Sequence, residues 1–259
     1  MPKRAKYLWR LMGTGLAFAA LGVGGVVLAL TVIPAATFFV DEEQRRNRRA
    51  QSIIHTSFRF YLQLLQMAGI LELEVIGGDK LSECRGKLVV ANHPTLLDIV
   101  ILMALLPDAK CVGKRQLWRN PMLRPVVSAA GYIRNDCEPE LLIEKCRASL
   151  LAGYNLIIFP EGTRSVPGQP LHFQRGFAHI LIASGASLRT VFISCDPVTL
   201  VKGQPYYKIP KSPPHFRIEV DDEIDAASYA SPTAGSRTLR ARRLASDVEL
   251  DYSRRLNHV

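Results

Sequence analysis

The segment that decides the fold is residues 88–98, which read Leu-Val-Val-Ala-Asn-His-Pro-Thr-Leu-Leu-Asp. Its first four residues, 88–91, form an uninterrupted apolar run with the length and composition of a buried strand. Residues 95–106 then have the pattern of an apolar helix, which Pro107 ends. A buried strand that leads through a short polar loop into a helix is the repeating unit of an α/β fold.

The same alternation of short apolar runs and longer helical ones continues to the end of the chain. Further strands are predicted at 110–112, 156–159, 190–194 and, as an edge strand, at 216–220. Helices are predicted between and after them, at 122–130, 138–151, 174–184 and 236–256. We therefore expect an α/β fold with a mixed, largely parallel sheet flanked by helices.

The amino-terminal region differs from the rest because residues 11–40 contain no Asp, Glu, Lys, Arg or His. About 20 apolar residues suffice for a helix to span a bilayer. A cleaved signal peptide has an apolar core of only about 7–15 residues, so we expect a membrane-anchoring helical segment instead. Pro34 leaves two topologies open, a single span and a re-entrant hairpin that turns at this proline. Basic residues flank the run on both sides, so the positive-inside rule does not fix its orientation.

A second segment, residues 53–70, carries apolar residues at helical spacing. Several arginines stand just upstream, so this helix is predicted either to lie on a membrane surface or to pack on the α/β domain. We divide the chain accordingly into an anchor at 1–45, an interfacial helix at 46–76 and an α/β domain at 77–259.

Composition narrows the classes of partner. The chain of 259 residues has a net charge of +10 and 48% hydrophobic residues, the balance of a globular protein that favours anionic surfaces. It contains no zinc-finger spacing, aromatic RNA-binding motif or basic heptad region, so nucleic acid is not expected as a partner. The five cysteines form no Cys-x-x-Cys pair. This pattern argues against a structural metal site or a disulfide framework and favours a reducing cytosolic environment.

The polar loop after the first strand holds the candidate catalytic pair. His93 follows the strand directly, at the position where α/β sheets carry ligand-binding and catalytic groups. Asp98 lies five residues later, where a bend of the loop brings its carboxylate to the imidazole to orient the ring and raise its basicity. The ring would then accept a proton from an attacking alcohol. The alternative is structural, because residues 95–98 also match a capping box at a helix start.

A second polar motif, Phe-Pro-Glu-Gly-Thr-Arg-Ser at residues 159–165, follows the predicted strand 156–159. Gly162 permits a tight turn and the close approach of a ligand to the backbone. Arg164 offers a planar fork for a phosphate or a carboxylate, and Glu161 is suited to hold that arginine or a substrate hydroxyl. A surface ion pair between Glu161 and Arg164 is the alternative interpretation.

Together the two motifs resemble those of the glycerol-phosphate/lysophosphatidate acyltransferase family. Residues 92–98 match its Asn-His-x4-Asp motif and residues 159–164 its Phe-Pro-Glu-Gly-Thr-Arg motif, in the same order and roughly 70 residues apart. The resemblance implies direct transfer of an acyl chain from acyl-CoA or acyl carrier protein to a hydroxyl of a lysophospholipid such as 1-acyl-glycerol-3-phosphate. It implies no metal, no cofactor and no covalent intermediate.

The resemblance also implies roles for individual residues. His93 is the general base and Asp98 its partner. The residues expected to bind substrate come from both motifs and from two loops between them: Asn92, Lys114, Arg134, Glu161, Gly162, Thr163 and Arg164. Residues 77–259 become the catalytic domain, expected on the cytoplasmic face of the inner membrane, with membrane lipid and a lysolipid acceptor as partners.

Two segments depart from the family pattern. Residues 131–137 place Arg134 three positions earlier than the family's Gly-x-Ile/Phe-x-Ile/Val-x-Arg motif, and Cys-Asp-Pro-Val at 195–198 replaces its Val-Pro-Val/Ile motif. Both segments belong to the acceptor side, so a different acceptor stays open as an alternative, such as a lyso-aminolipid or a specialised fatty-acid or polyene product. A non-catalytic lipid-binding membrane protein is the third interpretation, and the intact polar residues of both motifs argue against it.

Overall fold

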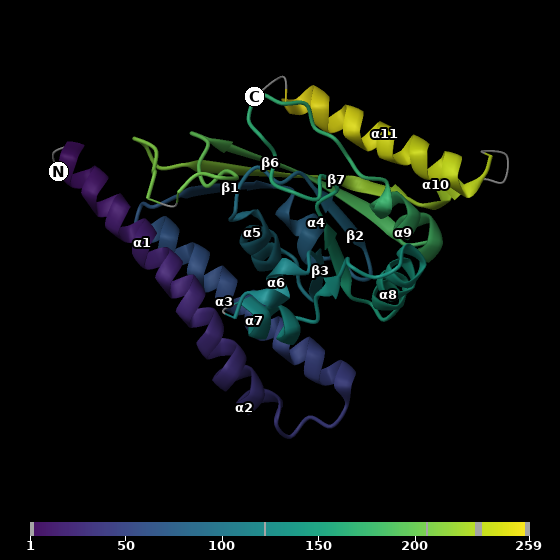
Figure 1. Ribbon diagram of the computed structural model, residues 1–259, viewed down its shortest axis with the longest axis horizontal. Helices are drawn as coiled ribbons and strands as arrows, with labels where there is room; N and C mark the ends of the chain where they lie inside the picture. The colour runs from purple at the N-terminus through teal and green to yellow at the C-terminus, as the bar shows by residue number, and fades with distance from the viewer. Residues whose placement is uncertain (1–2, 122, 206, 231–234, 257–259) are drawn as a thin grey trace.

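The computed structural model of the chain describes residues 3–121, 123–205, 207–230 and 235–256. Met122, with which one predicted helix begins, lies outside these ranges. Within them, a seven-stranded sheet carries helices on both faces, and a long helical arm runs along one side (Figure 1). The predicted α/β fold class is confirmed.

The sheet is mixed and largely parallel, as predicted. Its strands are β1 (Glu72–Ile76), β2 (Leu88–Ala91), β3 (Ala109–Gly113), β4 (Ile133–Arg134), β5 (Asn155–Ile158), β6 (Ser187–Asp196) and β7 (His215–Asp225). Their order across the sheet is β1-β7-β6-β2-β5-β3-β4. Among these described strands, β6 and β7 are the only neighbours that run antiparallel to each other.

The strand predicted at the sheet edge is β7, and this prediction was wrong, because β7 lies between β1 and β6. Alternation of apolar and polar residues reports which face of a strand meets solvent, and it does not report the place of the strand in the sheet. Phe216, Ile218 and Val220 are buried on one face, whereas Arg217 and Glu219 pair with each other on the other face. The short strand β1 forms the edge instead.

The amino-terminal arm is one continuous helical rod made of α1 (Lys3–Val27), a π-helical turn η1 (Leu28–Val32) and α2 (Ile33–Thr37). Among the described helices, only the stretch Arg4–Thr37 is long and apolar enough to cross a membrane. Of the two topologies left open, a hairpin that turns at Pro34 does not form, because the helical path continues through this residue. The π-helical turn η1 directly precedes α2, so the regular hydrogen-bond pattern is already altered where Pro34 lacks its N–H.

The chain reverses after α2 and returns as α3 (Glu43–Met67), which lies beside α1 (Figure 1). The hydroxyl of Tyr61 in α3 donates to the carbonyl of Ala17 at 3.1 Å, and the indole N–H of Trp9 donates to the carbonyl of Ala68 at 2.9 Å. The helix stops where Gly69 takes a left-handed φ of +66°. The interfacial helix predicted over 46–76 is therefore shorter, and residues 72–76 belong to the sheet as β1.

Two hydrophobic cores separate the sheet from its covering helices. Alternate residues of β2 enter different cores: Val89 and Ala91 pack on the side of α3 and α5 (Asp98–Leu105), and Leu88 and Val90 pack on the opposite side. The opposite side is covered by α8 (Pro139–Leu151), α9 (Gly176–Ser184) and α11 (Arg237–Leu256). The remaining helices are short: α4 (Gly78–Ser82), α6 (Gln116–Arg119), α7 (Leu123–Ala129) and α10 (Ala227–Ala230). Strand β2 is therefore buried on both faces, as its apolar run predicts.

Tyr252 of α11 ties this helix to the centre of the sheet. The β6–β7 ladder shifts register between Arg189 and Val191, and the buried hydroxyl of Tyr252 accepts the N–H of Val191 at 3.0 Å. The single hydrogen of the same hydroxyl lies within reach of two carbonyl oxygens, that of Val90 at 2.9 Å and that of Val191 at 3.1 Å. The hydroxyl thus satisfies backbone groups at a place where the regular ladder is interrupted.

We expect the Tyr252→Phe substitution to lower the free energy of unfolding by about 1–3 kcal/mol, because it leaves buried backbone groups without their partner while keeping the ring. Denaturant titration of the full chain in detergent micelles measures the change. Leu250→Ala, at a side chain of the same helix that is 52% exposed, is the control. Equal stabilities of Tyr252→Phe and the native chain would show that the hydroxyl contributes nothing.

Candidate active site

Both polar motifs lie at the carboxyl ends of the parallel strands. The strands β2, β5, β3 and β4 are neighbours in that order. His93 follows β2, Glu161 follows β5, Lys114 follows β3, and β4 ends in Arg134. Adjacent strands lie about 4.8 Å apart, so β5 is one spacing from the strand of His93, whereas β4 is three spacings or roughly 14 Å away. The sheet therefore brings Glu161 beside His93 and places Arg134 on the outermost strand, farthest from His93.

The imidazole of His93 is oriented by the carboxylate of Asp98. Nδ1 of His93 lies 2.8 Å from Oδ2 of Asp98. An ionised carboxylate only accepts hydrogen bonds, so Nδ1 carries the proton and Nε2 keeps its lone pair. No described residue forms a hydrogen bond with Nε2, and the side chain of His93 is 18% exposed. The ring stacks on Phe159, with centroids 4.1 Å apart, which fixes its plane.

Asp98 also organises the loop that separates it from His93. Its two carboxylate oxygens accept the backbone N–H of Thr95 at 2.7 Å and the hydroxyl of Thr95 at 2.5 Å. These bonds hold residues 95–97 in a turn, so α5 begins at Asp98 and not at residue 95 as predicted. Burial raises the pKa of Asp98, and the hydrogen bonds from His93 and Thr95 oppose this shift by stabilising the ionised form. One carboxylate thus both holds the turn before α5 and pairs with the histidine.

Glu161 supports the backbone of His93 from the neighbouring strand. Its Oε1 accepts the backbone N–H of His93 at 2.8 Å and the hydroxyl of Ser165 at 2.9 Å. The backbone N–H of Ser165 in turn donates to the carbonyl of His93 at 2.7 Å. Burial raises the pKa of Glu161, while its two donors lower it. Glu161 therefore holds His93, and no ion pair joins it to Arg164 in the described part of the chain.

Asn92 joins the end of β2 to β6. Its side chain is buried, and Oδ1 accepts the N–H of Ile193 at 2.7 Å while Nδ2 donates to the carbonyl of Ile193 at 2.8 Å. Both ends of the amide are thus occupied by the backbone of the neighbouring strand. In this structure Asn92 fixes the position of the loop that begins at His93.

The rest of the second motif forms a tight turn whose arginine reaches away from His93. Gly162 has a φ of +65°, so the turn that the sequence predicts is present. Thr163 is half-buried in the same turn. Nη1 of Arg164 donates to the carbonyl of Leu200 at 2.8 Å, in the loop between β6 and β7. The second motif thereby contacts two other loops of the site.

The two basic residues predicted between the motifs stay apart from His93. Lys114 is exposed at the end of β3. Arg134 makes a two-pronged contact with Asp136, in which Nε donates to Oδ1 at 2.9 Å and Nη2 donates to Oδ2. The bond to Arg134 lowers the pKa of Asp136. The guanidinium is therefore engaged by a carboxylate of its own loop.

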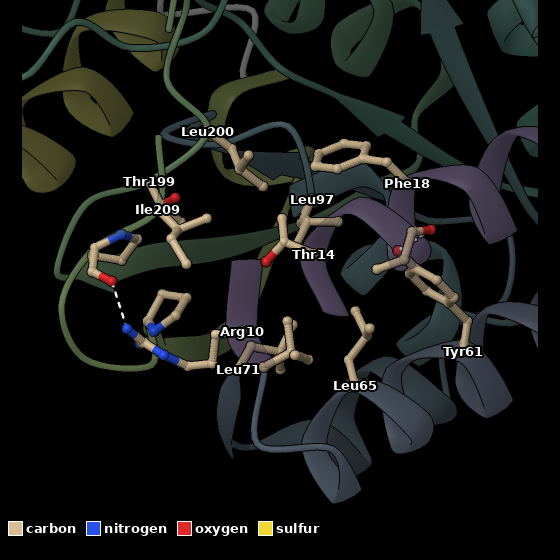
Figure 2. Close-up of a pocket in the computed structure, with 14 residues that line it drawn as sticks. Arg10, Thr14, Phe18, Tyr61, Leu65, Leu71, Leu97, Thr199, Leu200 and Ile209 are labelled. Atoms are coloured by element: carbon tan, nitrogen blue, oxygen red, sulfur yellow. Dashed lines mark hydrogen bonds between the residues drawn. The ribbon is translucent and has the colours of Figure 1, made fainter. Parts of the chain in front are cut away.

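An open cavity lies beside Leu97, in the loop that follows His93 (Figure 2). Leu97, which precedes Asp98, forms part of its wall together with Phe18 of α1, Leu65 of α3 and Leu200. The side chain of Arg10 lies at one end, where its Nη2 donates to the carbonyl of Pro210 at 2.7 Å. The cavity is thus largely apolar and lies between the loop that follows His93 and the amino-terminal arm.

Sequence reasoning missed three residues of this site. Phe159 and Ser165 stand at the two ends of the second motif, and their place beside Glu161 was a usable signal. Leu200 gave no signal, because its contact with Arg164 depends on the path of the loop between β6 and β7. Within the described ranges, no group of three or more His, Cys, Asp or Glu side chains is placed to hold a metal ion.

Comparisons with known proteins agree with this geometry. The family model described as Acyltransferase matches residues 72–194, a range that contains both motifs. The chain is similar to the 1-acyl-sn-glycerol-3-phosphate acyltransferase of Helicobacter pylori (strain J99 / ATCC 700824), with 31% identity over 157 residues, which cover 58% of this chain and 61% of that protein. It is 34% identical to the enzyme of the same name from Cocos nucifera over 113 residues, which cover 41% of this chain and 36% of that protein. The chain thus spans between about a third and three fifths of the length of these two relatives.

The fold has a close counterpart among solved structures. The crystal structure of the 1-acyl-sn-glycerophosphate (LPA) acyltransferase PlsC from Thermotoga maritima matches with a TM-score of 0.70. The match covers 96% of this chain and 97% of that one at 17% identity, so it shows a shared fold over nearly the whole length. The family model and the relatives confirm the resemblance that the two motifs carried. The chain therefore contains a domain of the acyltransferase family, which residues 72–194 span.

Proposed function

We propose that this protein is an O-acyltransferase that moves a fatty acyl chain from acyl-CoA or acyl carrier protein to a hydroxyl of a lysophospholipid such as 1-acyl-glycerol-3-phosphate. The observation that carries the proposal is the oriented imidazole of His93, whose Nδ1 is held by Asp98 while Nε2 has no partner among the described residues. The names of the relatives support the type of acceptor.

The chemistry follows from this arrangement. Nε2 of His93 accepts the proton of the acceptor hydroxyl as the hydroxyl oxygen attacks the thioester carbonyl. The carbon–sulfur bond then breaks, and the proton passes from the imidazolium to the departing thiolate. Asp98 fixes the tautomer and stabilises the imidazolium between these two steps. Glu161 and Asn92 act on the same step indirectly, because they fix the backbone on which His93 stands.

The apolar cavity beside Leu97 supports a lipid substrate. Its wall combines side chains of the arm, including Phe18, with Leu97 of the loop between His93 and Asp98, so an acyl chain that enters from a lipid layer reaches this loop. We propose that it holds the acyl chain of the donor. The apolar stretch Arg4–Thr37 would attach the enzyme to the membrane beside its lipid substrates.

The acceptor headgroup is proposed to lie along the sheet edge, near Arg164, Thr163 and Lys114, where guanidinium and ammonium groups favour a phosphate. The contact between Arg134 and Asp136 supports an alternative acceptor. A guanidinium that already holds a carboxylate is a weaker phosphate ligand, which favours a lysolipid with a smaller negative charge, such as a lyso-aminolipid.

We propose that the catalytic domain faces the cytoplasm at the inner membrane, where acyl-CoA and acyl carrier protein are available. The cysteines support this side of the membrane, since all five are unpaired. The net charge of +10 supports contact with anionic lipid or with an acidic donor protein.

The test of the proposed function uses the purified full chain in lipid nanodiscs with radiolabelled palmitoyl-CoA and palmitoyl-acyl carrier protein. Each donor is paired with 1-acyl-glycerol-3-phosphate, a lyso-aminolipid and lysophosphatidylcholine. We expect label to appear in a diacylated product with at least one donor–acceptor pair. Binding of lysolipids without any transfer would support the non-catalytic interpretation and overturn the proposal.

Two substitutions at Glu161 separate its charge from its hydrogen bonds. Glutamine keeps an oxygen that accepts the same N–H and hydroxyl, whereas alanine frees the backbone of His93. Because displacement of a catalytic group by about 1 Å costs on the order of 10²-fold in rate, we expect Glu161→Ala to lose about 10²-fold in kcat and Glu161→Gln to lose much less. Steady-state kinetics of both variants check this. Equal losses would show that the charge of Glu161 is needed, and not its support of the loop.

A further inference from the structure

Leu200 has a backbone conformation that a bulky residue rarely adopts. Its φ is +54°, in the left-handed region where the side chain crowds the backbone. Such outliers persist only where the surroundings hold them, and they cluster at ligand-binding sites. Leu200 lies in the loop between β6 and β7, close to the cavity and to the second motif.

Two contacts hold Leu200 in this conformation. Its side chain is only 7% exposed and forms part of the cavity wall. Its carbonyl accepts the hydrogen bond from Nη1 of Arg164 at 2.8 Å. In the view of Figure 2, Leu200 and Phe18 lie on one side of the cavity and Leu65 and Leu71 lie on the other. A shift of the Leu200 backbone would therefore change the width of the cavity directly.

The same residue connects the two parts of the site. Arg164 belongs to the acceptor motif, and Leu97, on the cavity wall with Leu200, belongs to the loop of His93 and Asp98. A charge-assisted bond from a half-buried guanidinium to a carbonyl is stronger than a neutral one. Arg164 is therefore suited to keep the wall in place against the strain at Leu200.

We infer that Leu200 determines which acyl chains the cavity accepts, and that Arg164 is a positioning residue that holds Leu200 in the cavity wall. This inference rests on the proposed function, because it assigns the cavity to the acyl chain of the donor. Loss of the Arg164 guanidinium lets Leu200 return to an ordinary backbone conformation and withdraw its side chain from the wall. An acceptor that draws the same guanidinium away would likewise change the choice of donor.

The test compares donors of different length in direct competition. The full chain in nanodiscs receives an equimolar mixture of acyl thioesters with 12 and 18 carbons, and the product ratio gives the ratio of their kcat/KM values. We expect Leu200→Ala to shift this ratio towards the longer chain by about tenfold, because a few methylene groups in an apolar pocket discriminate by this order. Leu200→Phe narrows the cavity and shifts the ratio in the opposite direction.

Arg164→Ala is expected to shift the ratio in the same direction as Leu200→Ala, besides any rise in the KM of the acceptor. The double variant is expected to show little more than the shift of Leu200→Ala alone, because both substitutions remove the same part of the wall. Arg242→Ala, at an exposed arginine of α11, controls for loss of charge and leaves the ratio unchanged. An Arg164→Ala variant with an unchanged donor ratio and only a raised acceptor KM would overturn the positioning role.

A second measurement does not require turnover. A palmitate probe with a diazirine at its terminal carbon is photolysed with the native chain and with Leu200→Ala and Arg164→Ala, and labelled peptides are identified by mass spectrometry. We expect labelling of the peptide that contains Leu200 in the native chain and at least a threefold loss in both variants. Labelling without acyl transfer would overturn the proposed reaction and leave the wall assignment standing. Absence of label at Leu200 in the native chain would overturn the inference itself. Circular dichroism of each variant verifies that it folds.

Discussion

The His93→Ala variant is expected to transfer acyl chains about 10²–10⁴ times more slowly than the native chain, which is the usual contribution of a general base. The structure gives the reason, because Asp98 binds Nδ1 of the imidazole, Phe159 stacks on its ring and no described residue forms a hydrogen bond with Nε2. The effect should appear in kcat, since the imidazole contributes most when the hydroxyl loses its proton. Single-turnover assays with labelled thioester measure the chemical step separately from product release.

The control for this variant is His172→Ala, at a histidine whose side chain is 92% exposed. We expect this control to keep native activity and both variants to keep membrane attachment and the native thermal transition. A His93→Ala protein that is folded, attached and within about threefold of native kcat would remove the proposed mechanism.

The Asp98→Asn variant is expected to lose a comparable factor of about 10²–10⁴ in kcat, because the wrong tautomer of the histidine is then favoured. Asparagine occupies the same space, but its NH2 group donates where the carboxylate accepted. An asparagine that donates to Nδ1 moves the imidazole proton to Nε2, the nitrogen that must act as base. The same change sets a donor against the N–H or the hydroxyl of Thr95, which also lowers stability.

Kinetics and thermal unfolding of Asp98→Asn are measured together. Asp222→Asn, at an exposed carboxylate that pairs with Lys80, is the matched control and should change neither quantity by much. If Asp98→Asn loses stability and keeps native kcat, Asp98 serves only as the capping residue that the sequence also allowed.

Much of the architecture was readable from local patterns. The apolar run at 88–91 predicts β2, and β5, β6 and β3 fall on the runs expected for them. The errors share one physical origin. The place of β7 inside the sheet and the strand at 72–76 both depend on neighbours distant in sequence, which periodicity does not report.

The contacts of the site likewise fall into short-range ones, which the sequence predicts, and long-range ones, which it does not. The pairing of His93 with Asp98 spans five residues, so a local bend was enough to predict it. The role of Glu161 was not predicted, because its contact with His93 spans 68 residues and exists only because β5 lies next to β2. Asn92 likewise bonds to Ile193 across 101 residues, where β6 lies on the other side of β2.

The sequence by itself determined most of the elements, the contact between His93 and Asp98 and the resemblance to the acyltransferase family, because these depend on residue type and short spacing. The tertiary structure decided which loops the pair would rely on. Glu161 and Asn92 hold the backbone of His93 because the order of the strands places β2 between β5 and β6. Arg164 reaches Leu200, and not Glu161, because the loop after β6 passes over the second motif. Hydrogen bonds form between groups that the fold brings within about 3 Å, and only the topology of the sheet determines which distant groups meet.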